Sequence, residues 1–410
     1  MDSLTHIVVG AAVGDLILGK KIGNRGMVLG ALAGSVPDFD VFTQLLTDDL
    51  GGLELHRAFT HSWVFMFTAP LLLAWLMPHW YRGAFRRWPG YPWLRGMIFV
   101  LFYLILAAGL TWITTFLAGW YGLIPGILGL TLGGVIFYNY YHAQIRGFAD
   151  HMQEPESVGF GQWYLLFALN ILIHIVLDCA TSYGTQIWYP FSNERVAWGN
   201  MAVVDLLFTL PLALTVSIAA ALPRSALLRK FLLVAGLVVS SIYWAGTWVN
   251  KDRVNGIWKE SLRMSHLEPS QSYASPTLTN NVLWHGVAVA GDSIYVGDYA
   301  LTDKNPVFRI TNRYAYWSSP PPDLAGTRAW RILTWFSKGY YHWKQEGEGY
   351  SFTDLRFGGI PSEGDDEGVF RFHLVKNGMG DWQVDGGREG NGQDIRAGLH
   401  SLWIRMKGLP

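Results

Sequence analysis

The chain is poor in cysteine and in charge. Its one cysteine, Cys179, excludes a disulfide within the chain and a cysteine-based zinc cluster, and its apolar surroundings predict a plain buried thiol. Only 15% of the 410 residues are charged, which is low for a soluble protein of this size. Lys plus Arg and Asp plus Glu number 31 each, so no basic field favours nucleic acid as a partner. No Lys or Arg precedes Lys20, so the start lacks the basic region of a cleavable signal peptide, and we expect the first residues to stay on the mature protein.

The hydrophobic residues are unevenly distributed. They make up 50% of the chain, with a mean hydropathy of +0.19. Nearly all of the excess lies before about residue 250, in runs long enough to cross a bilayer, while the remainder is polar and rich in turn residues. The sequence therefore predicts a polytopic α-helical membrane domain over residues 1–250 and a small soluble α+β domain over residues 251–410.

The first two apolar segments are short. A helix capped by Asp2 or Ser3 and running from Leu4 to about Leu18 would span ~22 Å, less than the ~30 Å hydrocarbon core of a bilayer. A second apolar segment, Gly26–Val36, follows. Both carry glycines four residues apart, a spacing that lets helices pack closely in lipid. We expect a half-depth helical hairpin rather than a pair of full spans.

Longer apolar segments, most of them flanked by Trp and Tyr, predict about six further membrane helices. They cover 63–77, 97–117, 121–138, 163–180, 202–222 and 231–248. The connections 79–96 and 224–230 carry basic residues and no acid, so the positive-inside rule places both in the cytoplasm. The same orientation places residues 35–62, residues 181–201 and everything after about residue 250 on the outside.

The region after residue 250 alternates β-branched and aromatic residues with polar ones, which is typical of strands. The clearest alternating segments are 282–290, 293–300, 307–316 and 369–376. Some helix is expected near Asp323–Lys338. The sequence therefore predicts a small antiparallel sheet with some helix, forming an extracytoplasmic α+β domain.

The stretch Ser35–Ser62 holds two Asp and two His residues between apolar segments, where bare charge is hard to tolerate. Carboxylates and imidazoles are ligands that divalent metals select, and Asp38 and Asp40 point the same way on an extended backbone. Together with His56 and His61 they predict a metal site at a membrane boundary. Taken one at a time, the alternative is a turn or cap Asp and an interfacial His.

Further candidate ligands come from two predicted helices. His174 and Asp178, four residues apart, lie on one helical face and can close on a single ion. The predicted topology puts them at the outer end of their helix, and His6 lies at a similar depth in the first turn of its own. Ionisable groups within membrane segments are functional by default. The candidate ligands on this side of the membrane are His6, Asp38, Asp40, His56, His61, His174 and Asp178.

Three nearby residues are candidates for catalysis. Asp40, like Asp38, can bridge two ions or act as a base. Arg57 can hold a phosphate or a developing oxyanion through its planar fork, with a snorkelling interfacial arginine as the alternative. Glu54 is a candidate general acid or base, with an exposed loop carboxylate as the alternative.

The order and spacing of several short segments resemble one known family. These segments are SLTHIVVGAAVG, SVPDFD, HRAFTHS, HIVLD and TSYGTQIWYPFS, and they resemble the bacterial YdjM-like family of membrane-bound metal-dependent hydrolases. The resemblance covers about residues 1–250. It implies a polytopic inner-membrane protein with a His/Asp metal centre, and its matching positions are the same seven candidate ligands. Residues 251–410 form an extension that many shorter members lack.

Together these features predict a metal-dependent hydrolase of the bacterial inner membrane, with its active site and C-terminal domain facing the periplasm or the cell exterior. The expected cofactor is zinc, as one or two ions, with manganese as the alternative. The expected substrate is a phosphoester or other ester of a membrane lipid or lipid-linked intermediate. The alternative is a non-catalytic membrane scaffold stabilised by metal, or a small-solute carrier, although carriers usually hold their ionisable residues near the midplane.

Overall fold

The computed structural model describes residues 1–87, 158–316, 319–359, 368–378, 380–385 and 401–408. The predicted membrane helices 97–117 and 121–138 lie outside these residues. The chain forms two compact units, one made of residues 1–70 and 165–410 and the other of residues 71–164. The first unit holds every candidate ligand.

The first helical run is longer than predicted. Helix α1 (Ser3–Gly14) continues through the π-helical turn η1 (Asp15–Gly19) into α2 (Lys20–Ile22), so the predicted end near Leu18 is wrong. Lysines fill the last turn, where cations are favoured, and the buried Asp15 is neutralised by Arg229, whose Nε donates to Asp15 Oδ2 at 2.9 Å. The run has 20 residues and is long and apolar enough to cross a membrane, unlike the half-depth hairpin that we predicted.

Helix α3 (Arg25–Ser35) packs closely against α1, as the glycine spacing predicted. A methyl group added at Gly14 would lie 2.6 Å from Gly30 Cα, and one added at Gly34 would lie 2.6 Å from the carbonyl oxygen of His6. Only glycine permits this approach of the two backbones. The contact brings the end of α3 beside the first turns of α1, where His6 lies.

The other long helices are α5 (Trp63–Arg87), α8 (Phe160–Cys179), α9 (Leu206–Ala221) and α10 (Leu227–Met264). Among the described residues, the helices that can cross a membrane by length and composition are Ser3–Ile22, Trp63–Tyr81, Phe160–Cys179 and Leu227–Met264. Helix α9 is shorter than predicted because Asp205 caps its start, with its carboxylate accepting from the amide of Phe208.

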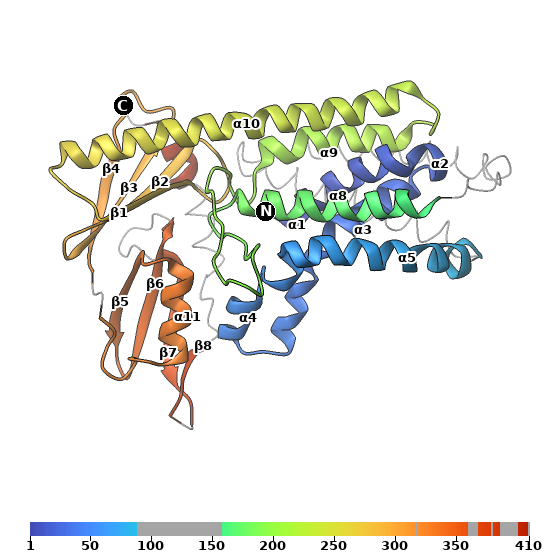
Figure 1. Ribbon diagram of the computed structural model, residues 1–410. Coiled ribbons are helices and arrows are strands. Elements are labelled where there is room, and N and C mark those ends of the chain that lie inside the picture. The colour runs from blue at the N-terminus through green and yellow to red at the C-terminus, as the bar shows by residue number, and fades with distance from the viewer. Residues whose placement is uncertain (88–157, 317–318, 360–367, 379, 386–400, 409–410) are drawn as a thin grey trace, which may run out of the picture. The chain divides into compact units, whose positions relative to one another are not determined.

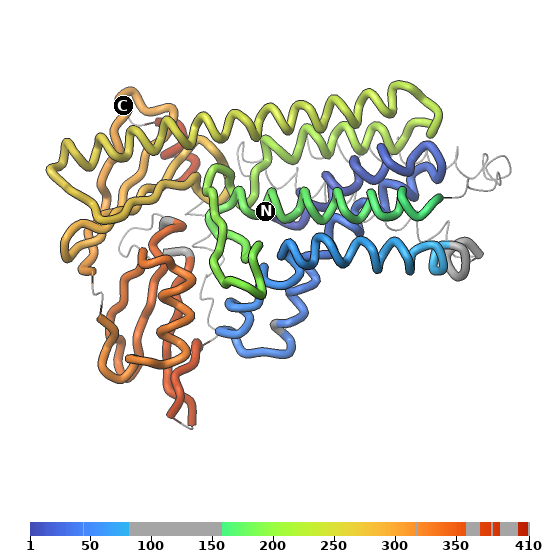
Figure 2. The backbone as a smooth tube through the Cα atoms, in the orientation of Figure 1, coloured from blue at the N-terminus to red at the C-terminus, as the bar shows by residue number. Residues whose placement is uncertain are grey.

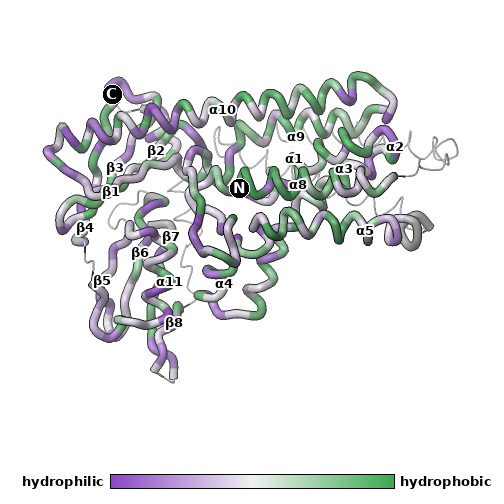
Figure 3. Tube along the Cα trace, viewed as in Figure 1, coloured by the Kyte–Doolittle hydropathy of each residue, from purple (hydrophilic) through white to green (hydrophobic). Residues whose placement is uncertain are grey.

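Helix α10 is much longer than the predicted 231–248. Its 38 residues correspond to ~57 Å, so it crosses the predicted domain boundary near residue 250 and continues into the C-terminal region. Figure 3 shows hydrophobic residues along α1, α3, α9 and the first half of α10, and hydrophilic residues toward the C-terminal end of α10. The division at residue 250 stays a prediction, but no break in the backbone marks it.

Short helical segments connect α3 to α5. They are the 3₁₀ helix η2 (Pro37–Leu45), the helix α4 (Asp49–Leu55) and the 3₁₀ turn η3 (Phe59–His61). The loop over residues 180–205 lies beside α4 (Figure 2), where the side-chain amide of Gln186 donates to the carbonyl of Glu54 at 2.7 Å. The connection from α3 to α5 carries candidate site residues, and the loop over residues 180–205 carries residues that contact it.

The C-terminal region contains two four-stranded antiparallel sheets rather than the single small sheet that we predicted (Figure 1). The first has the order β1 (Gln271–Pro276), β2 (Leu283–Ala290), β3 (Ser293–Ala300), β4 (Arg309–Ala315). The end of α10 packs on it, with Trp258 buried among Ala274, Trp284 and Ala288. Strands β2, β3 and β4 match predicted segments, whereas β1 was missed.

The second sheet has the order β5 (Tyr341–Glu346), β6 (Gly349–Gly359), β7 (Gly368–Lys376), β8 (Trp382–Asp385). Helix α11 (Arg328–Ser337) covers it, close to the predicted position. Of these strands only β7 was predicted. The buried core between α11 and the sheet also contains Leu50 of α4, so this sheet packs directly on the segment that joins α3 to α5.

Candidate metal centre

Four of the seven predicted ligands meet in one group. Asp38, His61, His174 and Asp178 each offer one ligand atom, and these atoms all lie within 4.8 Å of one another. Asp38 comes from η2 and His61 from η3, while His174 and Asp178 are i and i+4 on α8. Residues far apart in the sequence therefore converge on one point.

The spacing inside the group suits a divalent ion. His61 Nε2 lies 3.1 Å from His174 Nε2 and 3.2 Å from Asp178 Oδ2, and His174 Nε2 lies 3.4 Å from both Asp178 Oδ2 and Asp38 Oδ1. His61 Nε2 lies 3.9 Å from Asp38 Oδ1. Ligand atoms ~2.0–2.1 Å from a tetrahedral zinc ion lie about 3.3 Å apart.

Asp178 Oδ2 provides the test of whether a cation fits here. The nitrogens of Arg57, His61 and His174 approach it to 3.1, 3.2 and 3.4 Å, yet within the described residues none of them is aligned to donate a hydrogen bond to it. A buried carboxylate oxygen without a hydrogen bond is costly. The oxygen is thus poorly satisfied by the protein alone, and the donor set of two imidazoles and two carboxylates fits a metal ion.

The imidazole rings of His174 and His61 are oriented by contacts to their outer nitrogens, Nδ1. His174 Nδ1 lies 2.6 Å from the carbonyl oxygen of Gly34, which places a proton on Nδ1 and directs Nε2 toward the group. His61 Nδ1 lies 3.0 Å from Thr60 Oγ1 and 3.4 Å from Asp40 Oδ2. Partners of this kind on the outer ring nitrogen are the usual supports of metal-bound histidine.

Asp40 and His56 lie one layer behind the group. Asp40 is buried, and its Oδ2 accepts from the amide of Arg57 at 2.6 Å while its Oδ1 lies 3.2 Å from His56 Nδ1. Asp40 Oδ2 also lies 3.4 Å from His61 Nδ1. The Asp40 carboxylate therefore orients the ligand His61 and is not itself one of the group of four. The prediction that Asp40 and His56 are ligands themselves therefore has no direct geometric support.

His6 lies against the opposite side of Asp178. Its Nε2 is 3.2 Å from Asp178 Oδ1, and its ring stacks on that of His174 with centroids 3.6 Å apart. The amino group of Met1 also contacts Asp178 Oδ1. The two oxygens of Asp178 thus face different partners.

The two remaining catalytic candidates differ sharply. Arg57 is buried, with Nε 3.1 Å from Asp178 Oδ2, and its terminal nitrogens donate to Thr181 Oγ1 at 3.2 Å and to the carbonyl of Met1 at 3.3 Å. It turns inward, so the snorkelling alternative is wrong. Glu54 is exposed on α4 and contributes its carbonyl oxygen, not its carboxylate, to the contact with Gln186.

The ionisation of the residues outside the membrane helices suits metal binding. Burial alone would raise the pKa of Asp38, but the hydrogen bond and charge of His174 outweigh it and hold that pKa below its usual range. The pKa of Asp40 is likewise lowered, against the effect of burial, by His56, His61 and the amide of Arg57. Burial lowers the pKa of His61 to about 4. At neutral pH the carboxylates are ionised and His61 is neutral, as metal ligands must be.

Sequence reasoning missed Arg195, which ties the segments behind the site together. This buried guanidinium donates to the carbonyls of Leu53, His56 and Gly184, at 3.2 to 3.4 Å, and lies 4.5 Å from the ring centre of Tyr183. Burial lowers its pKa to about 10. Arginine in a loop rich in turn residues predicts a surface side chain, so no local signal marked it.

The C-terminal region packs on Tyr183 and Arg195. Phe336 of α11 contacts Tyr183 with ring centres 5.2 Å apart, and Lys338 Nζ donates to the carbonyl of Arg195 at 2.6 Å. Tyr183 in turn lies 5.1 Å from the guanidinium of Arg57. Helix α11, which covers the second sheet, therefore packs against the residues that surround the metal centre.

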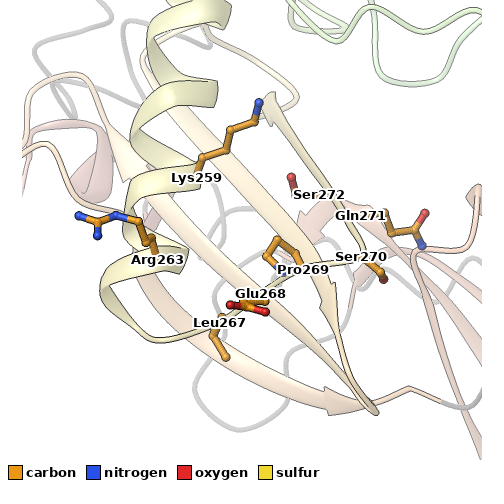
Figure 4. Close-up of a pocket in the computed structure, with 8 residues that line it drawn as sticks. All are labelled: Lys259, Arg263, Leu267, Glu268, Pro269, Ser270, Gln271 and Ser272. Carbon is orange, nitrogen blue, oxygen red and sulfur yellow. The ribbon is translucent and has the colours of Figure 1, made fainter.

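A surface hollow elsewhere is distinct from this site. It has a volume of about 620 Å³ and lies where α10 ends and β1 begins (Figure 4). Its lining includes Lys259, Arg263 and Glu268 and contains no candidate ligand. The open shape and solvent-facing charges make it a surface feature rather than an enclosed binding site.

Comparison with known proteins agrees with this geometry. Residues 1–251 match the model of a family described as YdjM inner membrane protein. The chain belongs to the YdjM family. The YdjM match ends where the C-terminal region begins, so both sheets lie outside it, and it supports a location in the inner membrane.

A curated relative is the Inner membrane protein YbcI of Escherichia coli (strain K12). It is 35% identical over 86 residues, which cover 21% of this chain and 50% of that protein. The chain thus aligns with about half the length of this relative. No solved structure matches the chain.

Proposed function

We propose that the protein is a membrane-bound metal-dependent hydrolase with its His/Asp centre at the outer face of the inner membrane. The observation that carries the proposal is the unequal exposure of the four ligands. The side chains of His61, His174 and Asp178 are 0% exposed, whereas that of Asp38 is 21% exposed. We therefore place the opening that an enzyme needs for water and substrate on the Asp38 side of the centre.

The cofactor that we propose is zinc, as one or two ions, with manganese as the alternative. A divalent ion in such a site polarises an ester or phosphoester oxygen and lowers the pKa of water. His61, His174, Asp178 and Asp38 would hold it, and a second ion beside His6 and Asp178 Oδ1 would have to displace the amino group of Met1. Two imidazoles and two carboxylates suit either metal.

The chain's own residues divide the remaining work. Asp38, on the exposed side, is the carboxylate best placed to accept a proton from water, through Oδ2, which accepts from Ser3 Oγ at 2.9 Å. Asp40 would have to release His56 or the amide of Arg57 to do the same, so we propose that it holds His61 in place instead. The buried guanidinium of Arg57 balances the charge of Asp178.

A lipid or lipid-linked ester is the substrate class that we propose. Supporting it, the ligands come from the end of a membrane helix, α8, and from the short segments that join α3 to α5. A site at that depth meets headgroups more easily than soluble molecules. The charge distribution of the loops supports the outer face, because the basic connections belong in the cytoplasm.

One observation favours a non-catalytic scaffold as the second candidate. The group has four ligands, as many as a closed structural zinc site. A scaffold would use the ion only to tie η2 and η3 to α8. This reading requires Asp38 to close the site permanently despite its exposure.

Metal analysis combined with a hydrolysis screen separates the two. Detergent-purified wild type, His174→Ala and Asp38→Ala would be compared by mass spectrometry and on lipid phosphomonoesters, phosphodiesters and acyl esters. His79→Ala, an exposed histidine on α5, is the matched control. The hydrolase requires a bound metal and an activity that both ligand variants lose and the control keeps. Metal bound without hydrolysis of any substrate supports the scaffold, and equal activity in the ligand variants excludes the proposed site.

A further inference from the structure

The 3₁₀ helix η2 has an exposed apolar face. Three residues per turn place side chains i and i+3 directly above one another, so Phe39, Phe42 and Leu45 form one stripe. Their exposed fractions are 56%, 58% and 80%, and the two phenyl rings lie 6.0 Å apart. Leu46, which follows, is exposed as well.

The opposite side of the same helix faces the metal centre. Asp38 Oδ1 lies 3.4 Å from His174 Nε2, and the buried Asp40 lies against His56 and His61. Thr43 Oγ1 donates back to the carbonyl of Asp40 at 2.6 Å. The helix thus presents its ligand and positioning carboxylates inward and its largest apolar side chains outward.

The apolar face continues a surface that belongs to the membrane. Only Val36 separates η2 from α3, where Leu32 is exposed, and no charged residue occurs between Asp40 and Asp48. In Figure 1 the chain that joins α3 to α4 runs across the direction of α1 and α3 rather than along it. Soluble surfaces rarely expose apolar stripes of this kind, whereas helices that lie in a membrane interface do.

We propose that η2 lies in the plane of the membrane interface, with Phe39, Phe42 and Leu45 inserted among the lipids. The partner of this face is the bilayer itself. Because the same short helix carries Asp38, the open side of the metal centre is held at the depth of the lipid headgroups. The inference does not depend on the hydrolase activity proposed above.

Site-directed spin labelling tests the proposal directly. The native Cys179 is buried and would be replaced in a Cys179→Ala background. Phe42→Cys and Leu45→Cys would be labelled with a nitroxide and reconstituted in vesicles of phosphatidylethanolamine and phosphatidylglycerol. Asp49→Cys, an exposed polar position in the first turn of α4, is the matched control. The readout is collision of each label with oxygen, which partitions into lipid, and with a water-soluble nickel chelate.

Labels at positions 42 and 45 should collide several-fold more often with oxygen than with the nickel chelate, and the label at position 49 should show the reverse. Frequent collision with nickel at all positions would place the face in water and overturn the proposal. Infrequent collision with both reagents would mean that protein covers it. Spin–spin broadening that disappears on dilution with unlabelled protein would identify a second copy as the cover, which also overturns the proposal.

Metal content and hydrolysis are not readouts of this experiment, so the two proposals can fail separately. If the stripe faces lipid but the protein binds no metal, the interface helix is supported and the hydrolase proposal fails. If the protein has a metal-dependent activity but the stripe faces water, the hydrolase is supported and the interface helix fails. Agreement of two labelled positions guards against a local effect of either substitution.

Discussion

Asp15, which lies within the first helical run, and Asp178, which contacts that run at His6, are both buried carboxylates, and they are satisfied in different ways. Asp15 forms a bidentate ion pair with Arg229. Arg229 Nε donates to Asp15 Oδ2 at 2.9 Å, and Arg229 Nη2 contacts Asp15 Oδ1. Around Asp178 Oδ2, three nitrogens gather without one aligned hydrogen bond among the described residues. The first arrangement is complete as an ion pair, whereas in the second Arg57 and the amino group of Met1 balance the charge but leave Oδ2 without a hydrogen bond, which a bound metal ion would compensate. Buried charge alone therefore does not mark a site, but poorly satisfied buried charge does.

The largest effect should come from breaking the complete pair. Arg229→Ala leaves Asp15 buried and unpaired, which costs about 3–5 kcal/mol for such pairs. Metal content should stay unchanged, because neither residue contacts the cluster. Unfolding in mixed detergent micelles measures the loss. The double variant Asp15→Leu with Arg229→Met should recover much of it, and equal stability of Arg229→Ala and wild type would contradict the comparison.

Metal removal should destabilise the other end of the helices. An ion that binds only the folded protein stabilises it by about 2.7 kcal/mol at a concentration of 100 times Kd. Stripping the wild type with a chelator should lower its unfolding midpoint, and zinc should restore it. His174→Ala should show neither response, since one ligand is missing, while Arg229→Ala should still respond. A response of equal size in His174→Ala would mean that the metal binds elsewhere.

A smaller effect distinguishes a ligand from its support. Asp40→Asn keeps the size of the side chain but weakens its hold on His61, and substitutions of such supports typically lower metal affinity ~10–100-fold. Asp38→Asn, which alters a ligand, should lower it more. Competition against a chelator of known affinity measures both. The reverse order would make Asp40 a ligand, as the sequence alone predicted.

The smallest effect is expected at Glu54. Glu54→Gln changes an exposed side chain outside the cluster, so the free energy of unfolding should shift by no more than ~0.5 kcal/mol and metal content should not change. Hydrolysis of any lipid ester found in the screen should also persist. A tenfold loss of kcat with intact metal would restore Glu54 as the general acid or base that the sequence suggested.

Several features could be predicted from the sequence because they depend on local periodicity. His174 and Asp178 share a helical face by their spacing, and the glycines of the first two helices predicted the close packing that is found. The alternating segments gave β2, β3, β4 and β7. The seven candidate ligands could be selected because Asp and His are costly among apolar residues, whatever the detailed fold.

Only the tertiary structure decided which candidates share one point. His61 and His174 are 113 positions apart, and the carbonyl of Gly34, 140 positions from His174, turns that ring toward the group. The sequence placed Asp40 and Asp38 on the same side of an extended chain, but the 3₁₀ turn sends one to the ligands and the other behind them. The length of the first helical run, α1 through α2, and the burial of Arg195 likewise depend on partners far along the chain. Side-chain direction is set by packing between segments, and that information is not local.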